Sequence, residues 1–437
     1  MHINKETSMQ DRELQPVRGM RDFYPNEMRQ RQRLFDLWRI TAERFGFEQY
    51  DASIVESLAL LKRKAGEEIT EQIYGFTDKS GRELALRPEM TPTLARMVLA
   101  RVNSLPMPLK WFAIGQFFRY ERMTRGRKRE HYQLNLDIIG EPEQIAEAEL
   151  IATALDILRN LNLTEKEIVV RVGSRQLLVD ILSERGFNNE KIEAIFLAID
   201  KRGKIPDEEI KSMLEEQGFS TVQIEFIFEI LSIGSFEDVK GMVKKDSVGI
   251  QHMQQFMDYA CMFVIEPYLQ FDISIVRGLS YYTGIVFECF DRDSQFRAIF
   301  GGGRYDKLFC SMAGIDLPAA GMGFGDVVIN EILKYYGKEI PQDKNLDHLV
   351  SYTDDSLVEK AVAIANKLRG NGHKVFLLYG PQRFKKALKF GSQIDAENLV
   401  LLDPIEVSQG KYIIKNLKTG VQENRVLGIN LSTKYCL

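Results

Sequence analysis

Apolar and polar residues follow two different periods in the first third of the chain. From Glu27 to Phe45 the apolar positions recur every three to four residues, which predicts a long amphipathic helix. The stretch GRELALRPEMTPTLARMVLA predicts a short strand, a turn marked by prolines and a helix. The segments Leu109–Tyr120 and His131–Gly140 are predicted strands. Because a charged segment joins them, we expect an antiparallel hairpin with one apolar face and one polar face.

The pattern changes near Gly173. Helical periodicity dominates from there to about Tyr268, so we expect a helical module inserted into a sheet-based domain. Strand patterns return at Phe271, and the apolar run Ile285–Phe290 predicts a buried strand. A helix from about Val327 to Tyr336 is expected to close this part of the chain.

Short apolar runs and helical segments then alternate to the end of the chain. They predict a small α/β domain of about 90 residues with a parallel or mixed sheet. Asp355 or Ser356 is expected to cap its first helix, and Gly370 to end it. The chain is therefore expected to divide into a first core segment (1–172), a helical insertion (173–268), a second core segment (269–340) and a C-terminal domain (341–437).

Composition narrows the choice of function. The formal net charge of the 437 residues is −4, so a polyanion would have to be recognised by local basic patches. The four cysteines form no C-x-x-C pair and the five histidines do not cluster, which argues against structural zinc and a disulfide framework. The leader MHINKETSMQDRELQ lacks an apolar core, and no apolar run has the length of a membrane span. We expect a cytosolic protein, with an organellar address left open.

One concentrated basic segment stands out against this acidic background. The hairpin connection RYERMTRGRKREH carries five arginines and one lysine against two glutamates. Guanidinium groups pair with phosphate or carboxylate through two parallel hydrogen bonds. A solvated hairpin tip explains most of this loop equally well, but Arg119 differs because it ends an apolar strand.

Three further clusters have polar or glycine-rich character. Gln133 and Asp137 share the polar face of a strand, where they suit a cationic or amphoteric ligand, although the pattern alone favours an ordinary wet sheet face. Glu89 and Thr91 lie one residue apart on a segment expected to be extended, and a carboxylate and a hydroxyl so placed suit an ammonium group. The glycines of FGGGRYDKL allow close approach of backbone to a ligand, or simply a tight turn, and do not form a Walker A loop.

Taken in order, these segments resemble the histidyl-tRNA synthetases, which are class II aminoacyl-tRNA synthetases. The resemblance covers nearly the whole chain and rests on RGMRDFYP, LRPEMTPTLAR, FRYERMTRGRKREHYQLNLDIIG, VRGLSYYTGIVFE and GGRYD. It implies an α+β fold, with a class II antiparallel sheet flanked by helices, a helical insertion and a C-terminal α/β anticodon-binding domain. It also implies ATP-dependent activation of L-histidine with release of pyrophosphate, followed by transfer to the 3′ end of tRNA(His) by a homodimer.

The resemblance also implies roles for individual residues. Arg277 and Arg119 are expected to be catalytic, Arg277 between the histidine carboxylate and the α-phosphate of ATP, and Arg119 on that phosphate. Histidine is expected to contact Glu89, Thr91, Gln133, Asp137, Tyr281, Tyr282, Gly302 and Tyr305. ATP is expected to contact Arg119, Glu121, Arg127 and Arg129, with the last two as alternative contacts for the tRNA acceptor end. The tRNA phosphates are expected to contact Arg383, Lys385, Lys386 and Lys389. ATP is expected to carry Mg²⁺, and no metal site made by the protein is predicted.

Three positions depart from the common pattern of this family. Ser53 replaces a proline of the dimer interface, and Ser280 replaces an aspartate before the two tyrosines. Val328 stands where class II enzymes carry an arginine that binds the γ-phosphate of ATP. Another cation, Arg127 or Arg129, would have to take that role in an active enzyme.

Two other functions are alternatives to the enzyme. A non-catalytic histidine-binding paralogue that regulates histidine biosynthesis accounts for the lost arginine, but such relatives lack the C-terminal tRNA-binding module. A pure RNA-binding scaffold leaves the ligand-facing residues unexplained. The sequence favours the enzyme.

Overall fold

The computed structural model describes residues 14–63, 70–202, 205–275, 282–338, 340 and 346–427. The chain forms two compact units, residues 1–340 and residues 341–437. Each unit has its own sheet and its own core. Among the described residues no helix is both long and apolar enough to cross a membrane.

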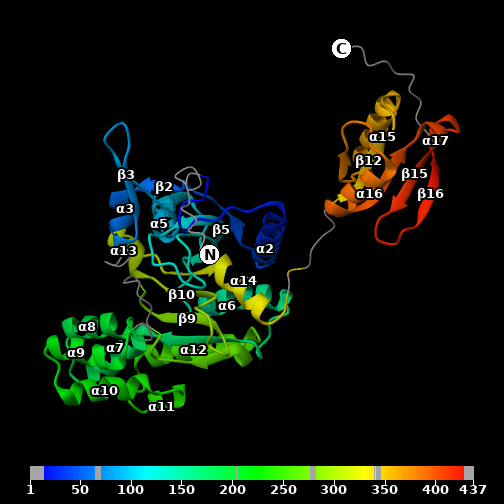
Figure 1. The fold of residues 1–437 in the computed structure, drawn as a ribbon. Coiled ribbons are helices and arrows are strands. Elements are labelled where there is room, and N and C mark those ends of the chain that lie inside the picture. The colour runs from blue at the N-terminus through cyan, green and yellow to red at the C-terminus, as the bar shows by residue number, and fades with distance from the viewer. Residues whose placement is uncertain are drawn as a thin grey trace, which may run out of the picture. The chain divides into compact units, whose positions relative to one another are not determined.

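An eight-stranded sheet forms the centre of the first unit (Figure 1). The strands, in spatial order, are β1 (Glu48–Gln49), β5 (Leu109–Phe118), β6 (Glu130–Ile139), β11 (Ala319–Gly325), β10 (Phe300–Arg304), β9 (Ile285–Asp291), β7 (Ile168–Ser174) and β8 (Leu269–Phe271). All neighbours from β5 to β7 are antiparallel, and the short edge strands β1 and β8 pair in parallel. The predicted hairpin is β5–β6, and the predicted buried strand is β9.

Helices cover one face of this sheet. The apolar stripe of α2 (Pro25–Arg44) places Trp38 5.5 Å from Phe324 of β11, measured between ring centroids. Helix α6 (Ile145–Asn160) is buried along most of its length and packs in the same core. Leu134 and Leu136 of β6 face this core, so the intervening polar residues of β6 face the other way. The period of two along β6 thus separates a core face from a polar face.

A three-stranded sheet lies beside the first. It contains β2 (Val55–Ser57), β4 (Glu83–Leu86) and β3 (Tyr74–Thr77), with α3 (Leu58–Lys62) and α5 (Thr91–Leu99). The predicted strand, turn and helix around Pro88 are therefore confirmed. The expected extended conformation of Thr91 is wrong, because Thr91 is the first residue of α5, where Pro92 is tolerated since its missing N–H has no helical partner there.

Among the described residues six helices lie between β7 and β8, in agreement with the helical period predicted for this segment. They are α7 (Arg175–Glu184), α8 (Asn189–Ile199), α9 (Asp207–Glu216), α10 (Thr221–Leu231), α11 (Phe236–Lys240) and α12 (Val248–Met262). Side chains of five residues cap five of them: Ser174, Asn188, Ser220, Ser235 and Ser247. A short 3₁₀ turn, Glu266–Tyr268, leads back to the sheet at β8, and α13 (Lys307–Ala313) and α14 (Asp326–Tyr335) follow β10 and β11.

The second unit is a five-stranded mixed sheet with three helices among its described residues. The strand order is β13 (Val375–Leu377), β12 (Leu346–Tyr352), β14 (Ala396–Leu402), β15 (Lys411–Asn416) and β16 (Gln422–Val426), with α15 (Val358–Gly370), α16 (Phe384–Gln393) and α17 (Pro404–Ser408). The mixed sheet is confirmed. The predicted cap is wrong, because the N-cap of α15 is Leu357, which makes no capping hydrogen bond. Asp354 instead caps the 3₁₀ turn Asp355–Leu357 before α15, where its carboxylate accepts from the backbone N–H of Ser356. The predicted end of the helix at Gly370 is confirmed.

Candidate active site

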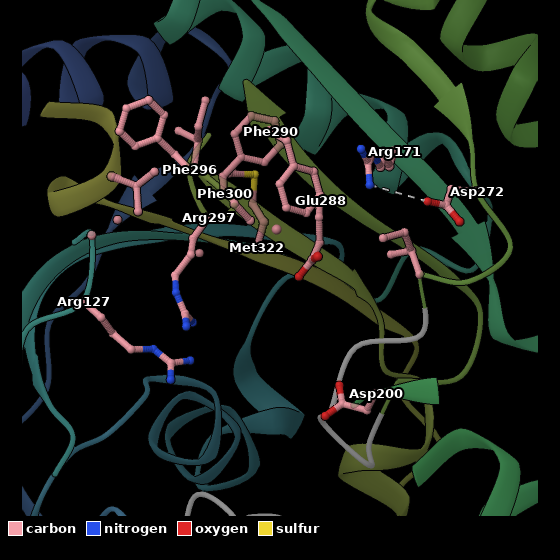
Figure 2. A pocket seen from close by; sticks show the side chains of 18 of the residues that line it. Arg127, Arg171, Asp200, Asp272, Glu288, Phe290, Phe296, Arg297, Phe300 and Met322 are labelled. Atoms are coloured by element: carbon pink, nitrogen blue, oxygen red, sulfur yellow. Dashed lines mark ion pairs between the residues drawn. The ribbon is translucent and has the colours of Figure 1, made fainter. Parts of the chain in front are cut away.

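A cavity of about 1440 Å³ opens on the polar face of the central sheet. Its lining comes from β6, β9, β10 and β11, from the β5–β6 connection, and from the starts of α5 and α14. Residues near the ends of α8 and α10 in the helical insertion also border it. Figure 2 shows part of this lining, with charged groups directed into the space from several sides. The cavity therefore collects segments that are far apart in the sequence.

The floor of the cavity is formed by Gln133, Asn135 and Asp137 of β6. The amide nitrogen of Gln133 lies 3.3 Å from Oδ1 of Asn135. Asn135 and Asp137 are only 5% and 3% exposed. The interpretation of these residues as an ordinary wet sheet face is therefore wrong. Asn135 is part of the floor although the sequence did not single it out.

Asp137 is the most unusual group on this floor. Its Oδ1 accepts a 2.6 Å hydrogen bond from the hydroxyl of Tyr305, while its Oδ2 is buried without a hydrogen-bond partner among the described residues. Burial raises the pKa of this carboxyl to about 7, and the hydrogen bond from Tyr305 acts in the opposite direction. An unsatisfied buried carboxylate oxygen of this kind is well suited to accept from a bound ligand.

Glycines on β11 leave room for the floor residues. A Cβ at Gly321 would overlap Oδ1 of Asp137 and lie 3.0 Å from the Tyr305 hydroxyl. A Cβ at Gly323 would overlap the amide of Gln133. Neither glycine is among the predicted site residues, although their alternation in AAGMGFG is visible in the sequence.

The glycine run of FGGGRYDKL is a strand and not a turn. Residues Phe300–Arg304 form β10, and a Cβ at Gly302 would overlap the backbone oxygen of Gly321 in the neighbouring strand. Gly302, a predicted histidine contact, does not line the cavity and instead permits close strand packing. Arg304 is also structural, because its guanidinium makes two 2.7 Å contacts with the carboxylate of Glu147 in the core.

The predicted ammonium-binding pair lies at the edge of the same cavity. Glu89 and Thr91 both line it, and Glu89 is 7% exposed. Arg119 is tied to this segment, since its Nε donates a 2.9 Å hydrogen bond to the backbone oxygen of Pro88. The strand end and the start of α5 thus place a carboxylate, a hydroxyl and a guanidinium around one region.

Cations of the β5–β6 connection form another wall. Arg127 and Arg119 line the cavity, and both form ion pairs with the buried carboxylate of Glu121. The distance from Nη1 of Arg119 to Oε1 of Glu121 is 3.9 Å. Arg129 does not line the cavity. Its guanidinium carbon lies 3.8 Å from the ring centroid of Tyr120, and its Nε donates to the backbone oxygen of Glu121.

The remaining predicted residues are placed as follows. Tyr282 is 7% exposed and lines the cavity. Arg277, Ser280 and Tyr281 lie outside the described residues. Val328 lines the cavity at the start of α14. In the second unit Lys385, Lys386 and Lys389 are exposed on α16, and Arg383 is exposed at its N-cap.

Comparison with known proteins identifies the family. The family model for histidyl-tRNA synthetase matches residues 19–325. The chain is 42% identical over 410 residues to a chloroplastic/mitochondrial histidine–tRNA ligase of Arabidopsis thaliana, covering 94% of this chain and 84% of that protein. It is 37% identical over 412 residues to the histidine–tRNA ligase of Opitutus terrae, covering 93% and 94%. The chain therefore belongs to the histidyl-tRNA synthetase family.

Solved structures support the same fold. The histidyl-tRNA synthetase of Nostoc sp. PCC 7120 matches with a TM-score of 0.78 at 22% identity, over 94% of this chain and 97% of that one. A protein of Bacillus halodurans described as an ATP phosphoribosyltransferase regulatory subunit/histidyl-tRNA synthetase matches with a TM-score of 0.73 at 20% identity, over 89% and 98%. The α+β fold expected from the sequence is confirmed.

Proposed function

We propose that this protein is a histidine–tRNA ligase that activates L-histidine with ATP and transfers it to tRNA(His). The observation that carries the proposal is a buried carboxylate with one free oxygen, Asp137, in a cavity that is also lined by arginines. Family membership supports the same reaction. The regulatory paralogue considered from the sequence is not favoured, because the relatives at 35–42% identity are named as ligases.

The α-ammonium group and the imidazole N–H of histidine are hydrogen-bond donors that complement the acceptors of the cavity. Glu89 and Thr91 are proposed to bind the α-ammonium group, and Oδ2 of Asp137 to accept from an imidazole N–H. The Tyr305 hydroxyl is already used by Asp137, so we assign Tyr305 to positioning that carboxylate. Gln133, Tyr281 and Tyr282 are proposed to complete the pocket. A site that pairs the polar atoms of imidazole rejects apolar side chains strongly, because its own groups would then be left unpaired.

Activation needs little proton chemistry from the protein. The carboxylate of histidine is already ionised, attacks the α-phosphorus of ATP, and displaces pyrophosphate. Catalysis then consists of orientation and stabilisation of the negative charge that develops on the phosphoryl oxygens. Arg119 and Arg277 are proposed to supply this charge, and one well-placed donor is typically worth about 10²–10³ in rate.

Mg²⁺ is proposed to enter with ATP. Within the described part of the chain no group of three or more His, Cys, Asp or Glu side chains is placed to hold a metal. Mg²⁺ at nucleotide sites is commonly held by phosphate oxygens, water and one or two carboxylates.

Further proposals concern the assembly. The C-terminal unit is proposed to bind the anticodon region of tRNA, and the active protein to be a homodimer, which sedimentation equilibrium tests. The division at residues 172, 268 and 340 remains a proposal for the domain boundaries. The cytosol is the proposed compartment, to be checked by imaging the tagged protein in its own cells.

Pyrophosphate exchange into ATP tests the function. Purified protein is assayed with histidine and with a panel of other amino acids. Exchange that depends on histidine alone is the expected result, followed by charging of tRNA(His). Binding of histidine without any exchange would overturn the proposed activity and favour the regulatory class.

A further inference from the structure

The start of α14 brings no cation to the cavity. Val328, which lines the cavity there, is 8% exposed. The β5–β6 connection passes close by, since a Cβ at Gly126 would lie 3.6 Å from Cγ2 of Val328. The acidic residue of this helix start, Asp326, is turned inward to an ion pair with Arg21 at 3.0 Å. A polyphosphate in this part of the cavity must therefore be neutralised from other elements.

Most of the described cations that line the cavity are already paired with carboxylates. Arg119 and Arg127 both pair with Glu121. The other pairs are Arg125 with Glu331, Arg171 with Asp272 and Arg202 with Asp207. The structure gives Arg297 and Lys128 no ion pair with a described carboxylate, and both are exposed. Of these two, the arginine has the planar donor geometry that binds a phosphate through two hydrogen bonds.

The position of Arg297 is set by a well-anchored connection between β9 and β10. The buried carboxylate of Asp291 accepts hydrogen bonds from the backbone N–H groups of Gln295 at 2.8 Å and Phe296 at 2.9 Å. The Phe296 ring packs against Tyr335 of α14, with centroids 5.5 Å apart. The residue before Arg297 is thus fixed by both backbone and side-chain contacts, so the backbone that carries the Arg297 side chain is already ordered.

Arg297 and Arg127 are directed toward one another. In Figure 2 their side chains extend into the same space, Arg127 from the β5–β6 connection at the left and Arg297 from the β9–β10 connection above it. Arg127 is already paired with Glu121, so Arg297 supplies the charge that no described carboxylate balances. Two converging guanidinium groups and one carboxylate leave a net positive potential, which an anion with several oxygens relieves.

We infer that Arg297, together with Arg127, binds the terminal phosphates of ATP and the pyrophosphate that leaves. This inference rests on the proposed function. It adds which residue provides the positive charge for the γ-phosphate, since Val328 occupies the position where class II enzymes carry an arginine. Arg129, the other candidate from the sequence, is stacked on Tyr120 outside the cavity lining. Arg297 belongs to none of the motifs that carry the family resemblance.

The test compares ligands that differ only in their phosphates. Affinities for ATP, pyrophosphate and AMP are measured by calorimetry for the wild type and for Arg297→Ala, Arg297→Lys and Lys128→Ala. In Arg297→Ala the affinities for ATP and pyrophosphate are expected to fall about 10- to 100-fold, while that for AMP stays within about twofold. Arg297→Lys is expected to recover part of the loss, because a point charge lacks the bidentate geometry. Arg292→Ala, on the same connection and outside the cavity lining, is the matched control.

The outcomes separate this inference from the proposed function. Histidine-dependent exchange by the wild type is established first, and its absence would overturn the function. With exchange present, unchanged ATP affinity in Arg297→Ala, or an equal loss for ATP and AMP, overturns the inference and leaves the function standing. A phosphate-specific loss found in Lys128→Ala and not in Arg297→Ala also overturns it. Because Arg297 is exposed, the unfolding midpoint of each variant is expected to match that of the wild type.

Discussion

The hydroxyl of Tyr305 donates a 2.6 Å hydrogen bond to Oδ1 of Asp137 on the cavity floor. The two residues come from β6 and from the segment after β10, and the bond fixes the direction in which Oδ2 faces. An unpaired buried acceptor costs about 1–3 kcal/mol, which a donor of the ligand restores. The proposed hydrogen bond from an imidazole N–H of histidine would remove this cost.

Replacing Asp137 with asparagine tests this relationship. The variant keeps the shape of the side chain and loses its negative charge. We expect kcat/KM for histidine to fall about 10- to 100-fold, with the KM for ATP nearly unchanged, because a charge-assisted hydrogen bond is worth about 1.5–3 kcal/mol. Pyrophosphate exchange at varied histidine concentration measures both constants.

Tyr305→Phe is the companion variant. It keeps the Asp137 carboxyl group but removes the hydrogen bond that directs it and lowers its pKa, so a smaller loss is expected than for Asp137→Asn. Asp137 would be discarded as a histidine contact if the asparagine variant kept a normal kcat/KM for histidine.

The raised pKa of Asp137 predicts a pH dependence of stability. Its pKa in the folded protein is about 7, well above its ordinary value. Between about pH 4 and pH 7 the folded state holds a proton that the unfolded state has released, so this group lowers stability as the pH rises. Without histidine, the free energy of unfolding of the wild type relative to Asp137→Asn should fall over that range, by at most about 1.4 kcal/mol per pH unit, and level off above it. Urea unfolding of both proteins at a series of pH values measures this, and a constant difference would contradict it.

The sequence was sufficient to predict the polar side chains but not their burial. The period of two along β6 put Gln133 and Asp137 on one face, because alternation is local to a strand. This face is the floor of a cavity because β11 pairs with β6. The residues of β11 that pair with Gln133 and Asp137 lie more than 180 residues further along the chain. Long-range strand pairing of that kind leaves no periodic trace in β6 itself.

For the cations of the cavity, too, some positions could be predicted from the sequence and others depend on the fold. Arg119 could be recognised because it ends an apolar strand, and the structure places it beside Glu89. Arg129 looked equivalent to Arg127 in the sequence, yet stacking on Tyr120 keeps it out of the cavity lining. Arg297 follows no period and belongs to no motif, so only the fold of the β9–β10 connection reveals where it lies.

Gly321→Ala tests the fit between β11 and the floor. The added Cβ would overlap the carboxylate of Asp137 and approach the Tyr305 hydroxyl to 3.0 Å, so the hydrogen-bonded pair must move. We expect histidine affinity to fall at least about tenfold and the unfolding free energy to fall by about 1–3 kcal/mol, as for other overpacked sites. Gly325→Ala, on the same strand, has nothing within 4 Å of its Cβ position and is the control for stability. Equal stability of the two variants, together with normal histidine binding in Gly321→Ala, would rule out this close fit.

The exposed lysines of α16 predict a variant that is weakened in tRNA binding but not in histidine activation. Lys385, Lys386 and Lys389 are exposed on α16, so their ammonium groups are free to approach phosphates. The combined alanine variant of the full-length chain should bind tRNA(His) more weakly, and the slope of log affinity against log salt should become shallower by about 1 for each lost phosphate contact. Pyrophosphate exchange should not change, because activation of histidine needs no tRNA contact. Lys418→Ala, an exposed residue between β15 and β16, serves as the control for a lost positive charge. An unchanged salt dependence of tRNA binding in the triple variant would mean that the tRNA is held by another surface.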